Sequence, residues 1–102
     1  MNLVSLREVL EPAAEGGYAV GAFNANNMEI VQAIIEAAAE ENSPVIVQAS
    51  QGAIRYAGLD FIVAMVKAAA GGVKIPVVLH LDHGTDYEQV IRCIRYGFSS
   101  VM

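Results

Sequence analysis

Two histidines and one aspartate stand close together in the stretch His80-Leu-Asp-His83. The stretch ends an apolar run that begins at Pro76, and Gly84 follows it directly. A β-branched run opened by proline and closed by glycine is typical of a buried parallel strand. The carboxylate of Asp82 and the imidazole of His83 would then lie at the carboxyl end of that strand, where α/β sheets and barrels carry their chemistry.

The spacing separates the two histidines. Alternation along a strand directs His80 and Asp82 to one face and His83 to the other, unless the chain has already turned at His83. We therefore expect the two histidines not to chelate one ion together. His80 fits a hydrogen-bonded core residue. On residue type alone, the Asp82–His83 pair fits a catalytic role and a helix-capping role equally well.

Composition limits the class of protein. The chain has 102 residues, of which 55% are hydrophobic and 17% charged, and its net charge is −5. This is enough for one small α/β domain and too little for two. Six scattered basic residues in an acidic chain argue against a nucleic-acid partner. A small phosphorylated substrate is not excluded, because backbone N–H groups bind phosphate without a net positive charge.

Cysteine usage and hydropathy bear on the location of the protein. Cys93 is the only cysteine, which leaves no intrachain disulfide and no CxxC metal site. It lies in a helical pattern as a small packed residue. No apolar run approaches the roughly 20 residues needed to span a bilayer. Arg7 and Glu8 interrupt the first ten residues, which does not fit a signal peptide. We expect a cytoplasmic protein with no membrane partner.

Strand and helix patterns alternate along the chain, which indicates consecutive βα units and a right-handed parallel sheet. Strands are expected at residues 18–24, 45–50 and 76–82 and from residue 99 onward. Ser5 with Glu8, and Asn26 with Glu29, suit the starts of the first two helices, and later helices begin near Leu59 and Thr85. A looser loop is expected around residues 54–58. Apolar residues at helical spacing predict the core-facing sides: Ile30, Val31, Ile34, Ile35 and Ala38; Ile62, Met65, Val66 and Ala69; and Val90, Ile91 and Ile94.

The chain ends inside the fourth expected strand, with no helix after it. An open α/β domain would normally end on a helix or an edge strand. A (β/α)8 barrel typically needs about 250 residues. We therefore expect residues 1–102 to be the amino-terminal βα units of a TIM barrel with parallel strands. They would form a single partial domain, about the first half of the barrel.

Several stretches carry a resemblance to a known family: Gly21-Ala-Phe-Asn-Ala-Asn-Asn-Met-Glu29, Ser43-Pro-Val-Ile-Val-Gln-Ala-Ser50, Val78-Leu-His-Leu-Asp-His-Gly84 and Gly97-Phe-Ser-Ser-Val-Met102. Through them the chain closely resembles class II fructose-bisphosphate aldolase, the metal-dependent type, over nearly all of its length. Tagatose-bisphosphate aldolases share the His-x-Asp-His stretch and are the close alternative. A barrel fragment without catalysis is the other reading.

The resemblance implies roles for four residues. His83 matches a ligand of the catalytic Zn²⁺, or of another divalent ion, and Asp82 matches the acid that protonates the aldehyde oxygen during condensation. Ser50 and Asn24 match strand-end positions that help to hold a substrate phosphate. In the family, the other zinc ligands and the proton-abstracting glutamate lie beyond residue 102, so these residues alone are expected to be inactive. The resemblance also implies a sugar bisphosphate substrate, a place in glycolysis and a homo-oligomer.

The chemistry of the reaction agrees with those roles. Aldol cleavage leaves an enediolate whose negative oxygen needs an electrophile, either a Lewis-acid metal or a lysine Schiff base. Lys67 is expected within a helix and Lys74 before a strand, away from the catalytic edge. Ser50 and Asn24 also suit turns in which they satisfy backbone groups, so residue type alone leaves capping and phosphate contact open for both. We interpret the loop residues Gln51, Arg55 and Tyr56 as surface residues.

Overall fold

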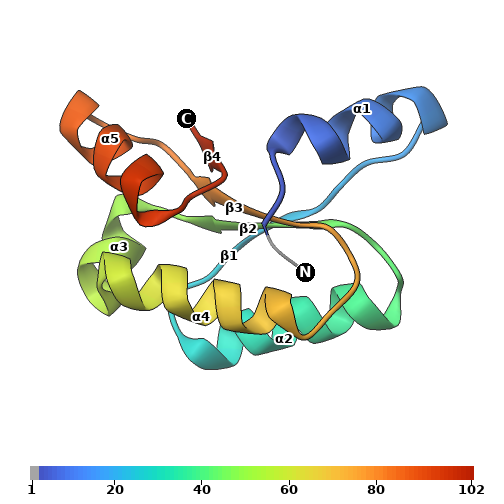
Figure 1. The fold of residues 1–102 in the computed structure, drawn as a ribbon, viewed down its shortest axis with the longest axis horizontal. Coiled ribbons are helices and arrows are strands. Elements are labelled where there is room, and N and C mark those ends of the chain that lie inside the picture. The colour runs from blue at the N-terminus through green and yellow to red at the C-terminus, as the bar shows by residue number, and fades with distance from the viewer. Residues whose placement is uncertain (1–2) are drawn as a thin grey trace.

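Four parallel strands form one sheet, and their order in the sheet follows their order in the chain (Figure 1). The computed structural model describes residues 3–102. The helices are α1 (Leu6–Gly16), α2 (Met28–Glu40), α3 (Gln51–Ala57), α4 (Leu59–Gly71) and α5 (Tyr87–Tyr96), and the strands are β1 (Ala22–Asn24), β2 (Val45–Ala49), β3 (Val77–Leu81) and β4 (Ser100–Val101). The predicted parallel α/β fold is confirmed, and sequential parallel strands are the arrangement of half a (β/α)8 barrel.

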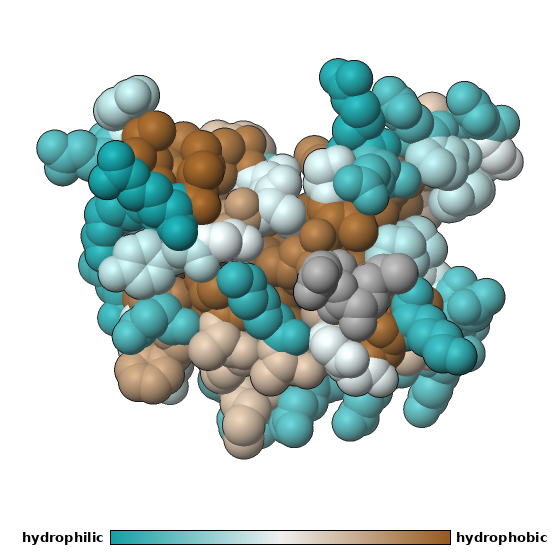
Figure 2. Space-filling model, in the orientation of Figure 1, coloured by the Kyte–Doolittle hydropathy of each residue, from teal (hydrophilic) through white to brown (hydrophobic). Residues whose placement is uncertain are grey.

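One face of the sheet would line the interior of a barrel, and α1 covers its amino-terminal end (Figure 1). Ile46 and Val78 lie side by side on this face and pack against Val9 of α1, which is buried. The backbone N–H of Val4 donates to the carbonyl oxygen of Val77 at 2.9 Å, which fixes the start of the chain to the sheet. In the same orientation, hydrophobic residues are visible between α1 and α5 (Figure 2).

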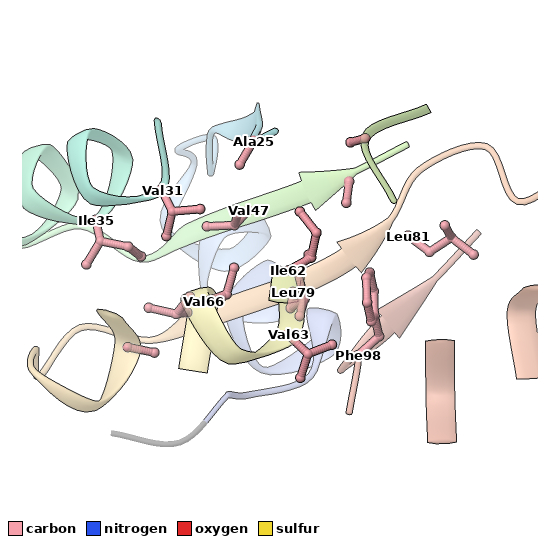
Figure 3. Close-up of a cluster of buried hydrophobic side chains, with 14 of the residues drawn as sticks. Ala25, Val31, Ile35, Val47, Ile62, Val63, Val66, Leu79, Leu81 and Phe98 are labelled. Carbon is pink, nitrogen blue, oxygen red and sulfur yellow. The ribbon is translucent and has the colours of Figure 1, made fainter. Parts of the chain in front are cut away.

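The opposite face of the sheet carries the main hydrophobic core. Val47 and Leu79 point from the strands toward α2 and α4 (Figure 3) and are buried with Ile35, Ile62 and Val66. Every second strand residue faces this side, because successive side chains of a strand alternate between its two faces. The main core therefore lies on one side of the sheet, and on the other face the side chains beyond the Val9–Ile46–Val78 cluster are left for the site.

Capping side chains set where most helices begin. Ser5 accepts a hydrogen bond from the N–H of Glu8 at 3.3 Å, as the pattern predicts. The prediction that α2 begins at Asn26 is wrong by one residue. Asn27 is the cap, because its backbone is extended and its Oδ1 accepts from the N–H of Ile30 at 2.9 Å. Asp86 caps α5 in the same way through the N–H of Gln89 at 2.7 Å.

Residues 54–58 do not form the predicted loop. They belong largely to α3, a helix of seven residues that ends at Gly58 with a φ of +97°. Ala53 and Ile54 are buried and form the inner side of this helix. A helix of two turns is too short to show an apolar repeat, and Gly52 lowers the helix propensity of its first turn. The sequence pattern therefore missed it.

Two further expectations need correction. The first strand begins at Ala22 rather than Tyr18, because the N–H of Tyr18 instead donates to the carbonyl oxygen of Ala13 and closes the end of α1. Ile30 and Ile94, predicted to face the core, are 37% and 50% exposed. In the described part of the chain, residues 3–102, no helix combines the length and the hydrophobicity needed to cross a membrane.

Candidate active site

The four residues singled out from the sequence lie at one edge of the sheet. Asn24 is the last residue of β1, Ser50 follows β2, and Asp82 and His83 follow β3. These strands are parallel and paired in register, so their carboxyl ends meet at the same edge. The fold therefore brings together four side chains that are up to 59 positions apart in the sequence.

Asp82 and His83 form the centre of this edge. The N–H of Asp82 continues the strand ladder by donating to the carbonyl oxygen of Ala49 at 3.0 Å. His83 has a φ of +54°, so the chain has already turned at this residue and strand alternation no longer sets its direction. Its Nε2 lies 3.7 Å from Oδ1 of Asp82; the Asp82 side chain is 20% exposed and the His83 side chain 78%. An exposed imidazole thus stands beside a largely buried carboxylate.

His80 is a core residue, as expected. It is only 9% exposed, and its Nδ1 lies 2.7 Å from Oγ of Ser100 on β4. Burial lowers the pKa of His80 below its ordinary value of 6.5, and the charge of Asp82 partly opposes this effect. A neutral, hydrogen-bonded His80 stabilises the pairing of β3 with β4.

Ser50 caps α3. Its backbone is extended, and its Oγ accepts a hydrogen bond from the N–H of Ala53 at 3.2 Å. The capping role left open by residue type is therefore present in the structure. Because a serine hydroxyl both accepts and donates, the Ser50 proton is still able to bind an oxygen of a ligand.

Asn24 does not cap a helix. Its Oδ1 accepts a hydrogen bond of 2.6 Å from Nε2 of Gln48, the residue opposite it on β2. The same Nε2 lies 3.4 Å from Oδ2 of Asp82. Gln48 therefore connects two of the four predicted site residues.

Two glutamines at this edge were not predicted from the sequence. Gln48 interrupts an otherwise apolar strand, and a polar side chain in such a strand needs a hydrogen-bond partner, which was the available indication. Gln51, interpreted as a surface residue, is partly buried and its Oε1 accepts from Thr85 Oγ1 at 2.9 Å. This bond joins the loop after β3 to the start of α3.

The donor set at this edge suits a metal ion only in part. Within residues 3–102, no group of three or more His, Cys, Asp or Glu side chains is arranged to hold a metal. His83 offers an accessible ring nitrogen, the kind of ligand that Zn²⁺ prefers. Cys93 is buried in α5, and burial raises the pKa of its thiol, so it is a packed residue as expected.

The lysines lie away from this edge. Lys67 is part of α4, and Lys74 precedes β3 at the opposite end of that strand. No lysine of residues 3–102 is therefore placed to form a Schiff base at the carboxyl ends of the strands. The edge combines one exposed imidazole able to bind a metal, one carboxylate able to transfer a proton, and polar groups able to bind an anion.

Comparisons with known proteins were made for the whole chain. Residues 4–102 match the family model described as "Fructose-bisphosphate aldolase class-II". The chain is 52% identical over 100 residues to a fructose-bisphosphate aldolase of Thermus caldophilus, covering 98% of this chain and 32% of that one. It is 53% identical over 103 residues to the fructose-bisphosphate aldolase of Pseudomonas aeruginosa, covering 100% of this chain and 29% of that one.

Solved structures give the same fold. The YdjI aldolase from Escherichia coli K12 superimposes with a TM-score of 0.91 at 30% identity, covering 98% of this chain and 39% of that one. The fructose-bisphosphate aldolase from Campylobacter jejuni superimposes with a TM-score of 0.77 at 27% identity, covering 93% of this chain and 31% of that one. The chain thus spans between 29% and 39% of the length of these relatives.

Proposed function

Because the chain belongs to the class II fructose-bisphosphate aldolase family, we propose that it forms the amino-terminal part of a fructose-bisphosphate aldolase. The reaction is the reversible, zinc-dependent cleavage of fructose 1,6-bisphosphate to dihydroxyacetone phosphate and glyceraldehyde 3-phosphate. The intact enzyme acts in glycolysis as a cytoplasmic homo-oligomer. Relatives that are about half identical and are named fructose-bisphosphate aldolases support the substrate.

Each residue of the site has a proposed task. In the direction of condensation, Asp82 protonates the aldehyde oxygen. In the direction of cleavage, it removes the proton from the hydroxyl group that becomes this aldehyde oxygen. Ser50 and Asn24 hold a phosphate of the substrate through their hydroxyl and amide donors. His83 supplies one nitrogen ligand to zinc. Positioned acid–base groups and fixed hydrogen-bond donors are the two devices by which such a site would accelerate the reaction.

Zinc bound at this edge would supply an electrophile for the negative charge that develops on the dihydroxyacetone phosphate half of the substrate. A catalytic zinc site needs three protein ligands. His83 is the one ligand proposed within this chain, so the remaining ligands would come from the rest of the enzyme. The high exposure of the His83 side chain, 78%, supports its availability for such a shared site.

The single observation that carries the proposal is the Asp82–His83 pair at the carboxyl end of β3. Its 3.7 Å separation supports the proposal, because it would bring the carboxylate proposed for proton transfer next to the imidazole proposed as a metal ligand. An acid beside the metal can reach the oxygen whose charge changes during carbon–carbon cleavage. A helix-capping role for this pair has less support, because Asp86 is the residue that caps α5.

The mechanism is tested by separating metal from Schiff-base chemistry in the intact enzyme. We expect cleavage of fructose 1,6-bisphosphate to be abolished by a chelator and restored by added Zn²⁺. Borohydride in the presence of substrate should leave the activity unchanged, because no lysine imine forms. Tagatose 1,6-bisphosphate, assayed in parallel, distinguishes the two aldolase types. Inactivation by borohydride would contradict the proposal.

His83→Ala in the intact enzyme tests the ligand directly. Loss of one of three zinc ligands should lower the metal content well below one equivalent after dialysis and abolish cleavage. Metal content is measured by elemental analysis, with Gln32→Met on the exposed side of α2 as the control. A variant that retains one equivalent of zinc would remove His83 from the ligand set.

A further inference from the structure

A row of polar side chains crosses the inner face of the sheet below the site. Asn24, Gln48, His80 and Ser100 are register partners on the four strands. Two hydrogen bonds link them in pairs, one between Gln48 and Asn24 at 2.6 Å and one between His80 and Ser100 at 2.7 Å. The row lies at the level between the apolar pair Ile46–Val78 and the edge that carries Asp82.

Gln48 is the member of this row that reaches the site. Its Nε2 donates to Oδ1 of Asn24 at 2.6 Å and lies 3.4 Å from Oδ2 of Asp82. An amide nitrogen carries two protons, so one nitrogen can serve both acceptors. The backbone of Gln48 is fixed on both sides by strand pairing with β1 and β3. The pairing fixes the position of the Gln48 backbone, and the two contacts of Nε2 then limit rotation of the side-chain amide away from Asn24 and Asp82.

The bond to Gln48 determines which group Asn24 presents. Because Oδ1 of Asn24 accepts from Gln48, the NH₂ group of Asn24 is the one free to face a ligand. Asn24 lies on an edge strand and is exposed, so Gln48 supplies the side-chain contact that orients it. An anion requires donors, and a reversed amide would instead present an oxygen to it.

The Gln48 amide also gives the two carboxylate oxygens of Asp82 different neighbours. Oδ2 faces Gln48 at 3.4 Å, whereas Oδ1 faces Nε2 of His83 at 3.7 Å. A carboxylate bonded through one oxygen cannot rotate freely about its Cβ–Cγ bond. Oδ1 is thus the oxygen on the side of the exposed His83 imidazole.

We infer that Gln48 is the positioning residue of this site: its amide nitrogen orients Asn24 as a hydrogen-bond donor to the substrate and fixes the carboxylate of Asp82. The inference rests on the proposed function, from which the tasks of Asn24 and Asp82 are taken. Gln48 itself acts through these two side chains and needs no contact with the substrate.

Two replacements of Gln48 by side chains of similar length test whether it positions its neighbours or only fills space. Gln48→Met removes the donor, and kcat/KM should fall about tenfold to a hundredfold, the usual cost of a misplaced reacting group. Gln48→Glu replaces the donor by an acceptor, reverses the Asn24 amide and places a second carboxylate beside Asp82. It should therefore be the more damaging variant, although Glu is closer in shape and polarity to Gln. Gln32→Met on α2 is the matched control and should match the wild type.

Two further readouts address how Gln48 acts. Gln48→Glu should raise KM through Asn24 and lower kcat through Asp82. In an Asn24→Ala background, Gln48→Met should cost several-fold less than it does in the wild type, because part of its effect passes through Asn24. Equal losses from the Met and Glu variants, or fully multiplicative losses in the double variant, would overturn the inference.

A crystal structure of the Gln48→Met enzyme tests the inference without activity. The expected result is a changed or multiple orientation of the Asn24 amide and the Asp82 carboxylate; unchanged side chains would overturn the inference. An inactive wild-type enzyme would contradict the proposed function instead, and the crystal structure would still decide the role of Gln48. If Gln48→Glu fails to fold, the Met variant and the double variant decide.

Discussion

At the scale of single residues, the site is a set of side chains whose directions are fixed by their neighbours. Asp82 is held by the strand ladder through its N–H and by Gln48 through Oδ2. His80 lies on the same face two residues earlier and is bonded to Ser100. The chemistry proposed for Asp82 thus depends on groups that do not react.

Asp82→Ala in the intact enzyme should lower kcat by about 10² to 10⁴, the range in which general acid–base groups contribute. The zinc content should stay at the wild-type level, since the proposed ligand is His83. Steady-state kinetics and elemental analysis measure the two quantities. Asp82→Asn preserves the shape of the side chain and should be similarly slow. A turnover equal to that of the wild type would exclude Asp82 from the reaction.

His80 should make the stability of the fold depend on pH. Burial lowers the pKa of His80 below 6.5, so between the folded and the unfolded pKa values the unfolded chain binds the proton more readily. The contribution of neutral His80 to the stability of the fold is therefore complete above pH 6.5 and is lost as the pH falls from 6.5 through the pKa of the folded state. The free energy of unfolding should decrease by at most about 1.4 kcal/mol per pH unit from this group.

Urea unfolding between pH 7.5 and pH 5 measures this dependence. His80→Asn retains a polar group opposite Ser100 and removes the titration, so the difference between the two proteins isolates His80. The wild type should lose more stability on acidification than the variant. Parallel curves for the two proteins would contradict the prediction.

At the scale of the elements, the loop after β3 is fastened to its surroundings at two points. Thr85 donates to Gln51 at 2.9 Å, and the N–H of Gly84 donates to the carbonyl oxygen of Met102 at 2.8 Å. A Cβ at Gly84 would lie 2.6 Å from that carbonyl oxygen and 3.0 Å from Cδ2 of Leu81. Only glycine permits this close approach of the loop to the end of β4.

Gly84→Ala should therefore displace the loop that carries His83. We expect a loss of stability of about 1–3 kcal/mol, typical of overpacking against a fixed backbone, together with weaker metal binding. Gly71→Ala is the matched control, since a Cβ there meets nothing within 4 Å and alanine favours a helix. Thermal unfolding compares the two variants. If the Gly84→Ala protein were as stable as Gly71→Ala, the atoms around Gly84 would have moved to accept the added Cβ at no cost, which would contradict the prediction.

The same elements show how far prediction from the sequence extends. The order of strands and helices followed from hydrophobic periodicity, and the edge at which Asn24, Ser50, Asp82 and His83 gather followed from the parallel strands. The helix α3 has too few residues to show a period. The Gln48–Asn24 bond joins residues 24 positions apart, and it depends on a strand register that no local pattern contains.

At the scale of the whole molecule, the sheet has two open edges. The pairing of residues 3–102 leaves β1 and β4 each with one neighbour. Phe23 on β1 is 52% exposed and borders a cavity of about 430 Å³, which is also lined by Ile34, Ala37 and Val45. Unpaired strand edges and exposed apolar side chains favour association with another chain.

The 102-residue chain by itself should therefore self-associate. Light scattering over a concentration series should show a mean mass that rises with concentration. Phe23→Lys places a charge on the open edge of β1 and should shift the onset of self-association to a higher protein concentration. Tyr56→Lys, which replaces an aromatic side chain that is 75% exposed on α3, is the control and should behave as the wild type. A monodisperse monomer at all concentrations would contradict this prediction.

The sequential strand order also bears on how the chain folds during its synthesis. Asn24 meets Gln48, Gln48 meets His80 and His80 meets Ser100, separations of 24, 32 and 20 residues. Within residues 3–102, each of β2, β3 and β4 thus pairs with the strand made just before it. Such nearest-neighbour pairing keeps loop-closure costs small at every step. The sheet is able to grow in the order of translation, one βα unit at a time.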